Sequence, residues 1–240
     1  MRLATIIALT LTAWSAGYDA DRMHVAASSP IRRRLLLPTD AAHGTEVTAQ
    51  NGEQWLALTR MQGGYRTEMV NLRISAVPDP LAEDPNNREA KRVGLQQSAN
   101  PVFLLNGYAH LRDRNVPTSF DGNFKLVPHM PVSFHFAGRK IELQLQPNGK
   151  VDQAPGDERV ELFQVNVKRG AAWIPLPIVA TENYNAVELM WAGDLDGDGK
   201  VDFLFEDRGY NWSSLRLFLS TAAKFGQVVG EVAQFYQTGC

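Results

Sequence analysis

The sequence predicts an all-β protein, built as a sandwich or as barrel-like antiparallel sheets. Short apolar runs recur from about residue 45 onward, and dipeptides that favour tight turns separate several of them. No long segment after residue 17 has the apolar repeat that a helix would bury. Strands this short and this regularly interrupted are typical of sandwiches and barrels, and 240 residues are enough to bury a sizeable core.

Dipeptides that favour tight turns mark where several of the predicted strands end. Residues 45–59 should form a hairpin around Asn51-Gly52, because both residues tolerate the positive φ angles of a type I′ turn. Asn148-Gly149 and Arg169-Gly170 stand where two further hairpin turns are expected. The remaining strands are expected at residues 65–76, 102–105, 132–136, 140–145, 159–167, 173–179, 187–191, 201–205 and 215–219. Residues 225–236 could form a strand or a weak helix, and the two glycines of this segment argue against the helix.

Three parts are predicted along the chain: a signal peptide at residues 1–17, an irregular segment at residues 18–44 and a β domain at residues 45–240. The irregular segment carries Arg32-Arg33-Arg34, which we expect to be a solvated flank. Four prolines and an Asn-Asn pair interrupt the strand pattern at residues 77–101. This Pro-rich loop is expected to be a long surface connection or the boundary between two parts.

The first 17 residues have the features of an export signal. A short positive start, Met1-Arg2, precedes an apolar run over residues 3–14, and small residues follow at positions 15–17. The run is too short to cross a bilayer, which takes about 20 apolar residues, and no later stretch reaches that length. The sequence therefore predicts a secreted or periplasmic protein without a transmembrane segment after cleavage. A buried N-terminal strand or a membrane anchor is the alternative for this segment.

Charge and cysteine content narrow the choice of partners and of stabilising bonds. The formal net charge is −2, so no overall field favours nucleic acid or an anionic membrane. Cys240 is the single cysteine, which rules out an intramolecular disulfide. An exported protein without a disulfide must take its stability from its core and its ligands.

The segment most informative about chemistry is the loop from Asp194 to Asp202. Its acids stand at relative positions 1, 3, 5 and 9 and are Asp194, Asp196, Asp198 and Asp202. Alternate residues of a tightly curled loop can direct their carboxylates to one point, and Gly199 permits the sharp turn. Lys200 is expected to add its backbone carbonyl. Such a set suits Ca²⁺, which takes about six to eight oxygen ligands.

Alternatives to calcium in this loop are weaker. Zinc and copper prefer nitrogen and sulfur ligands, and Mg²⁺ seldom uses a cage made only of protein atoms. An EF-hand needs a bidentate Glu at position 12 and flanking helices, whereas position 12 is Phe205 and both flanks have strand character. An acidic turn without a metal is the remaining alternative, because Asp and Gly favour turns by themselves. Four carboxylates this close repel one another, which favours the metal.

The run Asp194-Leu195-Asp196-Gly197-Asp198-Gly199-Lys200-Val201-Asp202, followed by a strand, resembles the calcium loop of FG-GAP (integrin α-type, VCBS-like) repeats. The resemblance covers roughly residues 187–220, and the chain shows a single such repeat. It implies that the carboxylates of the four acids and the carbonyl of Lys200 ligate Ca²⁺. It also implies that the loop leads directly into a β-strand.

Binding and catalytic residues are less clearly marked. Tyr210 and Trp212 follow Gly209 in an expected loop and are candidates for binding a carbohydrate or a protein, although packing in the core is the alternative. No nucleophile elbow, zinc-binding helix or phosphate-binding loop is found. A pairing of His110 with Asp113 or Asp121 stays open.

The sequence therefore predicts an exported, non-catalytic calcium-binding β protein with a structural or partner-binding role. The alternative is an exported hydrolase with a dispersed active site, in which calcium is purely structural. A pocket that gathers histidine and acidic side chains away from the loop would favour the hydrolase, and a shallow aromatic surface would favour the first prediction.

Overall fold

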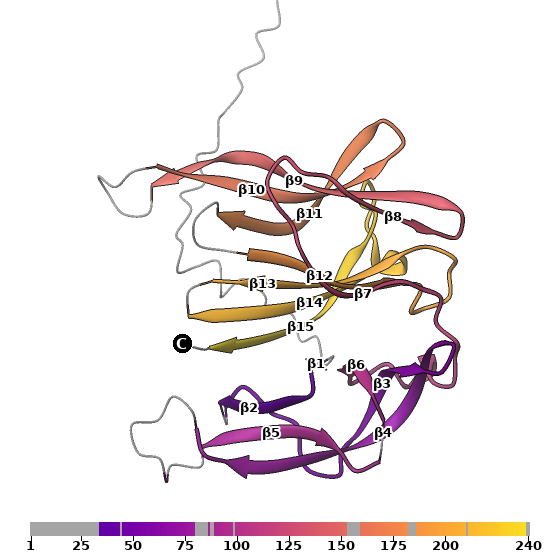
Figure 1. Ribbon diagram of the computed structural model, residues 1–240, viewed down its shortest axis with the longest axis vertical. Helices are drawn as coiled ribbons and strands as arrows, with labels where there is room; N and C mark the ends of the chain where they lie inside the picture. Colours follow the sequence, from indigo (N-terminus) through magenta and orange to yellow (C-terminus); the bar gives the residue numbers. More distant parts are fainter. Residues whose placement is uncertain are drawn as a thin grey trace, which may run out of the picture.

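Antiparallel strands account for nearly all of the regular structure in the computed structural model (Figure 1). The structure describes residues 34–43, 45–79, 86, 89–97, 99–152, 159–181, 186–209 and 211–238. The expected signal peptide, Tyr210 and Cys240 lie outside these residues. Within them the strands form three sheets, of six, five and four strands, and the all-β prediction is confirmed.

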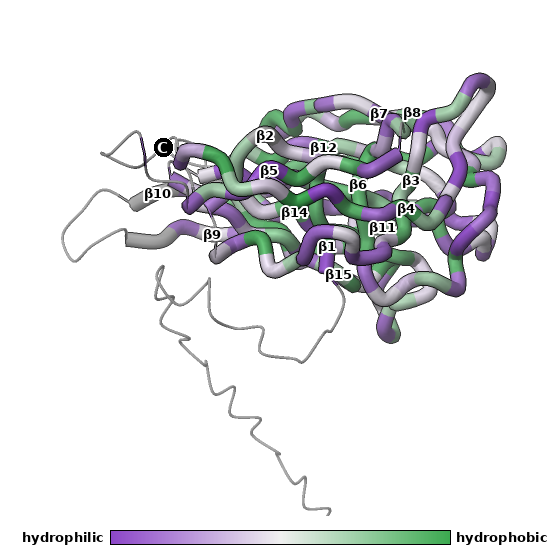
Figure 2. Tube along the Cα trace, turned by 90° about the horizontal axis from the view of Figure 1, so that it is seen from below, coloured by the Kyte–Doolittle hydropathy of each residue, from purple (hydrophilic) through white to green (hydrophobic). Residues whose placement is uncertain are grey.

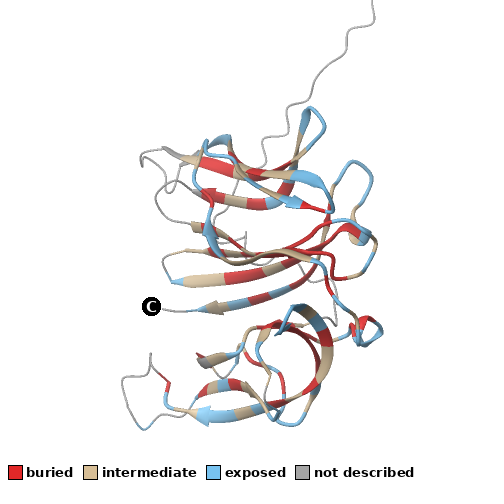
Figure 3. Cartoon of the chain, turned by 45° about the vertical axis from the view of Figure 1, so that its right-hand side comes forward, coloured by how far each residue is buried: buried red, intermediate tan, exposed pale blue. Residues whose placement is uncertain are grey.

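The six-stranded sheet has the order β1-β6-β3-β4-β5-β2 and curls on itself (Figure 3). Its strands are β1 (Leu35–Leu36), β2 (Thr39–His43), β3 (Gln54–Met61), β4 (Gly64–Val77), β5 (Ala90–Leu95) and β6 (Pro101–Leu105). Strand β5 lies inside the segment 77–101, so the expectation of one continuous loop there was wrong. Pairing with β4 explains the strand, because it buries Ala90 and Val93 against the sheet.

The expected hairpin around Asn51-Gly52 is also replaced by another arrangement. Residues 47–50 form no strand, although Val47 and Ala49 are buried. The Gly52 amide donates to the carbonyl of Leu72, and the Asn51 side chain accepts from the amide of Ile74. The Asn-Gly turn therefore fastens the start of β3 to β4 instead of joining two paired strands.

The four-stranded sheet has the order β11-β10-β9-β8. Its strands are β8 (Val132–Phe136), β9 (Arg139–Asp152), β10 (Arg159–Arg169) and β11 (Ala172–Thr181). Arg169-Gly170 lies at the turn between β10 and β11, as predicted. Asn148-Gly149 does not form a hairpin turn. It lies within β9, where the pairing with β10 shifts register, and Gly149 has a φ of +102°. The dipeptide therefore makes a β-bulge, which bends the strand without ending it.

The five-stranded sheet lies between the other two and has the order β15-β14-β13-β12-β7. Its strands are β7 (Thr118–Lys125), β12 (Ala186–Gly193), β13 (Asp202–Arg208), β14 (Trp212–Leu219) and β15 (Gly230–Thr238). Segment 225–236 is thus mainly strand. Two three-residue 3-10 turns, η2 (Ala109–Leu111) and η3 (Ser220–Ala222), supply the helical residues of the described chain. No helix in that part of the chain is long and apolar enough to cross a membrane.

Two hydrophobic cores cover the two faces of this central sheet. Leu204 of β13 packs in the core shared with the six-stranded sheet, whereas Phe203 and Phe205 pack in the core shared with the four-stranded sheet. Because both faces are covered, three successive apolar residues of β13, Phe203, Leu204 and Phe205, are all fully buried. Figure 2 shows the hydrophobic stretches along the strands, and Figure 3 shows that buried residues are concentrated in their middle parts.

Candidate metal centre

The acidic loop connects two paired strands of the central sheet. β12 ends at Gly193 and β13 begins at Asp202, and these two residues are partners in the ladder. The amide of Asp194 donates to the carbonyl of Pro117 at 2.8 Å, which ties the start of the loop to the segment before β7. A Cβ atom at Gly193 would lie 2.6 Å from that carbonyl oxygen, so only glycine permits this close approach.

Asp194 curls the loop around its own carboxylate. Oδ1 accepts from the amides of Gly197 at 2.5 Å and Asp198 at 3.1 Å, and Oδ2 accepts from the amide of Gly199 at 2.9 Å. The residue is 6% exposed. Backbone amides that donate hydrogen bonds to one carboxylate stabilise its negative charge. They also fix the curl of the loop, which brings later acids back toward Asp194.

Asp202 is fully buried and joins the loop to the next turn. Its Oδ2 accepts from the amide of Leu195 at 2.7 Å, and its Oδ1 accepts from the amide of Ser220 at 2.7 Å. Ser220 begins η3, which follows β14. The carboxylate therefore holds together the start of the acidic loop, the start of β13 and the end of β14.

Asp196 completes a group of three acids. One oxygen each from Asp194, Asp196 and Asp202 lie within 4.8 Å of one another, and this group could bind a metal ion. Oδ2 of Asp196 accepts from the hydroxyl of Thr221, whereas Oδ1 is buried and has no hydrogen-bond partner. An ionised carboxylate has about four lone-pair sites, so oxygens that already accept hydrogen bonds from backbone amides can still ligate a cation.

Asp198 and Lys200 pair with each other within the loop. The carboxylate of Asp198 is not part of the group of three: it accepts from the backbone amide of Lys200 at 2.8 Å and from its ammonium at 2.9 Å. Partial burial acts to raise the pKa of Asp198, but the nearby Ser220 hydroxyl and the hydrogen bonds from Lys200 outweigh this effect and lower the pKa overall. Ligation by Asp198 and by the carbonyl of Lys200 stays a prediction.

The three acids form a site of concentrated negative charge. Burial raises the pKa of Asp202 to about 8; repulsion from Asp196 and Asp194 adds to the rise, and the hydrogen bonds from Ser220 and Leu195 oppose it. A cation between these carboxylates would offset both the burial of charge and the repulsion.

Two residues distant in sequence complete the surroundings of the loop. Arg114 donates to the backbone carbonyl of Asp196, and a Cβ atom at Gly197 would lie 1.4 Å from its guanidinium. Thr221 holds the carboxylate of Asp196. These contacts span 82 and 25 residues of sequence, so no local spacing could have revealed them.

A cleft of about 270 Å³ opens beside Asp196. It is lined by Tyr108, His110, Leu111, Asp196, Leu219, Thr221, Ala222 and Val232. Asp196 is the member of the group of three acids that lines this cleft. Among the described residues, His110 makes no contact with Asp113 or Asp121: Asp121 binds Arg60 and Tyr65, and Asp113 lies 3.6 Å from Arg66.

Trp212, the described residue of the candidate aromatic ligand site, is remote from the acidic loop. Trp212 is half-buried at the start of β14 and stacks on Tyr236 of β15, with ring centroids 6.1 Å apart. β13 begins at the loop and ends at Arg208, next to the start of β14, so Trp212 lies at the opposite end of the sheet from Asp202. Trp212 therefore does not form a binding face beside the loop.

Comparison of the chain with protein-family models, with curated proteins and with solved structures found no match. The similarity of the loop to FG-GAP and VCBS-like repeats thus remains a prediction from its residues.

Proposed function

We propose that this chain is an exported, non-catalytic β protein that binds one Ca²⁺ in the loop Asp194–Asp202. The observation that carries the proposal is the convergence of Asp194, Asp196 and Asp202, with one buried oxygen of Asp196 left without a hydrogen-bond partner. The ion has a structural role, or supports the binding of a protein or carbohydrate partner elsewhere on the molecule.

Calcium fits this group better than other metals. All three side chains offer oxygen atoms, which hard cations prefer, and no cysteine or histidine is part of the group. Ca²⁺ also tolerates irregular geometry and binds backbone carbonyls, which a curled loop such as this one supplies. The export signal expected at residues 1–17 supports the same ion, since calcium is abundant outside cells, where weak sites of about 10⁻⁴–10⁻³ M suffice.

The ion would stabilise the connection between three elements. Asp202 already links Leu195 of the loop to Ser220 of η3, and Asp196 links the loop to Thr221. A cation that holds both carboxylates would restrict the β12–β13 connection and the end of β14 together.

Thermal unfolding with calcium and with a chelator tests this proposal. At a hundredfold excess of Ca²⁺ over Kd, an ion that binds only the folded state adds about 2.7 kcal/mol, and we expect the melting temperature to rise by roughly 5–10 °C. Equal melting temperatures in calcium and in EDTA would contradict it.

Asp196→Asn provides the variant for this test, because Asp196 has the unpartnered oxygen and is less buried than Asp194 and Asp202. We expect the variant to fold in EDTA and to lose most of the calcium-dependent rise. Asp113→Asn is the matched control: its side chain is 66% exposed, and it should respond to calcium like the parent protein.

A further inference from the structure

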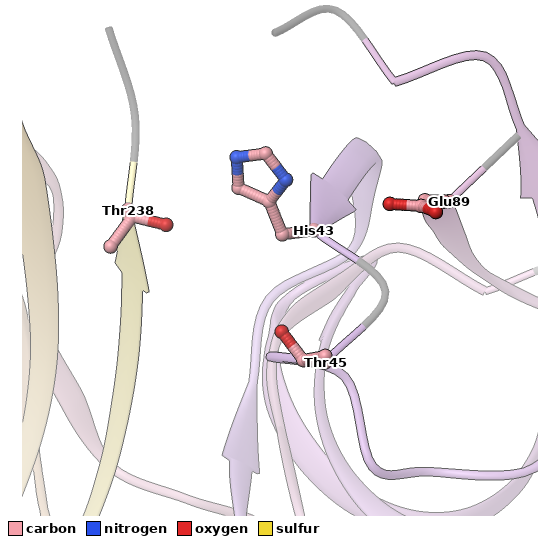
Figure 4. Close-up of a pocket in the computed structure, with 4 residues that line it drawn as sticks. All are labelled: His43, Thr45, Glu89 and Thr238. Carbon is pink, nitrogen blue, oxygen red and sulfur yellow. The ribbon is translucent and has the colours of Figure 1, made fainter. Parts of the chain in front are cut away.

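A second cleft lies at the other end of the central sheet. It measures about 500 Å³ and is lined, among the described residues, by His43, Thr45, Glu89 and Thr238 (Figure 4). His43 ends β2, Glu89 precedes β5, and Thr238 ends β15, so the cleft lies between the six-stranded and the five-stranded sheets. Thr238 pairs with Trp212, which places the cleft far from the acidic loop.

His43 projects into this cleft with a fixed orientation. Its Nδ1 lies 2.7 Å from Oδ2 of Asp79, whose side chain is only 5% exposed, whereas the His43 side chain is 26% exposed. When Nδ1–H of the neutral ring donates to this buried carboxylate, Nε2 is left as a hydrogen-bond acceptor. The backbone amide of His43 also donates to Glu46 at 3.0 Å, so both the ring and its backbone are held.

The other polar groups of the cleft are mainly acceptors. The hydroxyl of Thr238 donates a hydrogen bond to Glu46 at 2.6 Å, so the lone pairs of the Thr238 oxygen can accept a hydrogen bond from another group. Glu89 adds an exposed carboxylate, and Figure 4 shows the His43 ring between Glu89 and Thr238. Lys91 of β5, two residues after Glu89, directs its ammonium to the carbonyl of Val47 at 2.6 Å.

We propose that this cleft binds the head group of a primary amine. A primary ammonium has three N–H donors and one positive charge, and the cleft offers Nε2 of His43, the carboxylate of Glu89 and the oxygen of Thr238 as acceptors. The carboxylates of Asp79, Glu46 and Glu89 make the surroundings negative, so an anionic ligand would be repelled. This site is independent of the proposed calcium centre.

Nuclear magnetic resonance of the histidine rings, with the full chain in calcium, tests the proposal. Titration with propylammonium should shift the ring nitrogen signals of His43 in a saturable manner, and comparison with His43→Gln identifies those signals. Tetramethylammonium has the same charge but no N–H donor, and glycerol has donors but no charge. Neither should produce the saturable shift at equal concentration.

Substitutions distinguish binding of the amine in this cleft from a general attraction of cations to the protein surface. Glu89→Gln keeps the size of the side chain and removes its charge, and we expect propylammonium to bind roughly tenfold more weakly. Glu142→Gln on β9 is the matched control and should bind as the parent does, because Glu142 pairs with Lys140 and Lys168 on another sheet. An equal response to tetramethylammonium, no saturable shift with propylammonium, or unchanged binding in Glu89→Gln would each overturn the proposal.

Discussion

Replacing Trp191 by alanine is expected to lower the free energy of unfolding by about 3–5 kcal/mol, because the change empties a large volume in a core that cannot collapse fully. Trp191 of β12 is fully buried in the core between the six-stranded and the central sheets. Its ring meets that of Phe103 of β6 edge to face, with centroids 5.6 Å apart, and its Nε1 donates to the hydroxyl of Thr118 at 3.2 Å. The substitution therefore removes packing on both sheets and one partly buried hydrogen bond.

Urea unfolding followed by circular dichroism measures this loss. Trp212→Ala is the matched control, because Trp212 is half-buried at the start of β14, where it stacks on Tyr236. We expect a loss of less than about 1.5 kcal/mol there, since partly exposed side chains bury less area. If the two variants were equally destabilised, the packing of the six-stranded sheet on the central sheet would be contradicted.

Replacing Asp207 by asparagine is expected to stabilise the protein at alkaline pH. Burial on β13 raises the pKa of Asp207 from 3.8 to about 7, although the charge of Arg216 opposes the rise, and Oδ1 of Asp207 has no hydrogen-bond partner. The folded state therefore holds a proton that the unfolded state has already released between about pH 4 and pH 7, so stability falls as the pH rises through that range.

Between about pH 5 and pH 8 this carboxyl should remove about 2–3 kcal/mol of stability from the parent protein, and Asp207→Asn should escape that loss. Unfolding free energies measured across this range in EDTA test the expectation without interference from metal binding. Asp113→Asn, the same change at an exposed position, should follow the parent profile. Parallel profiles for the parent and Asp207→Asn would show that Asp207 is not the cause of the pH dependence.

The candidate metal centre was largely predictable because it is local. Asp194, Asp196 and Asp202 come together within nine residues of chain, and the glycines between them allow the curl. The position of Asp198 was less predictable, since its carboxylate has a competing partner two residues away in Lys200. The sequence contained no sign of Arg114 or Thr221, which reach the loop from other elements.

The second cleft, around His43, could not be predicted from local sequence. His43 and Asp79 are 36 residues apart, and Thr238 comes from the far end of the chain. No spacing in the sequence connects them, because antiparallel pairing and the packing of two sheets decide which residues meet at a sheet's edge. A pocket that gathers a histidine and acidic groups away from the acidic loop is also the feature expected of the alternative, hydrolytic function.

The sequence by itself determined the strand-rich fold, the turn at Arg169-Gly170 and the acidic loop, since each depends on residues close along the chain. Tertiary structure decided the roles of Asn51-Gly52 and Asn148-Gly149, because a turn-forming dipeptide reverses the chain only where the flanking strands pair with each other. It also decided that the polar segment Thr118–Lys125 becomes the edge strand β7. Strand formation there follows from backbone pairing with a neighbouring strand, which a single segment does not encode.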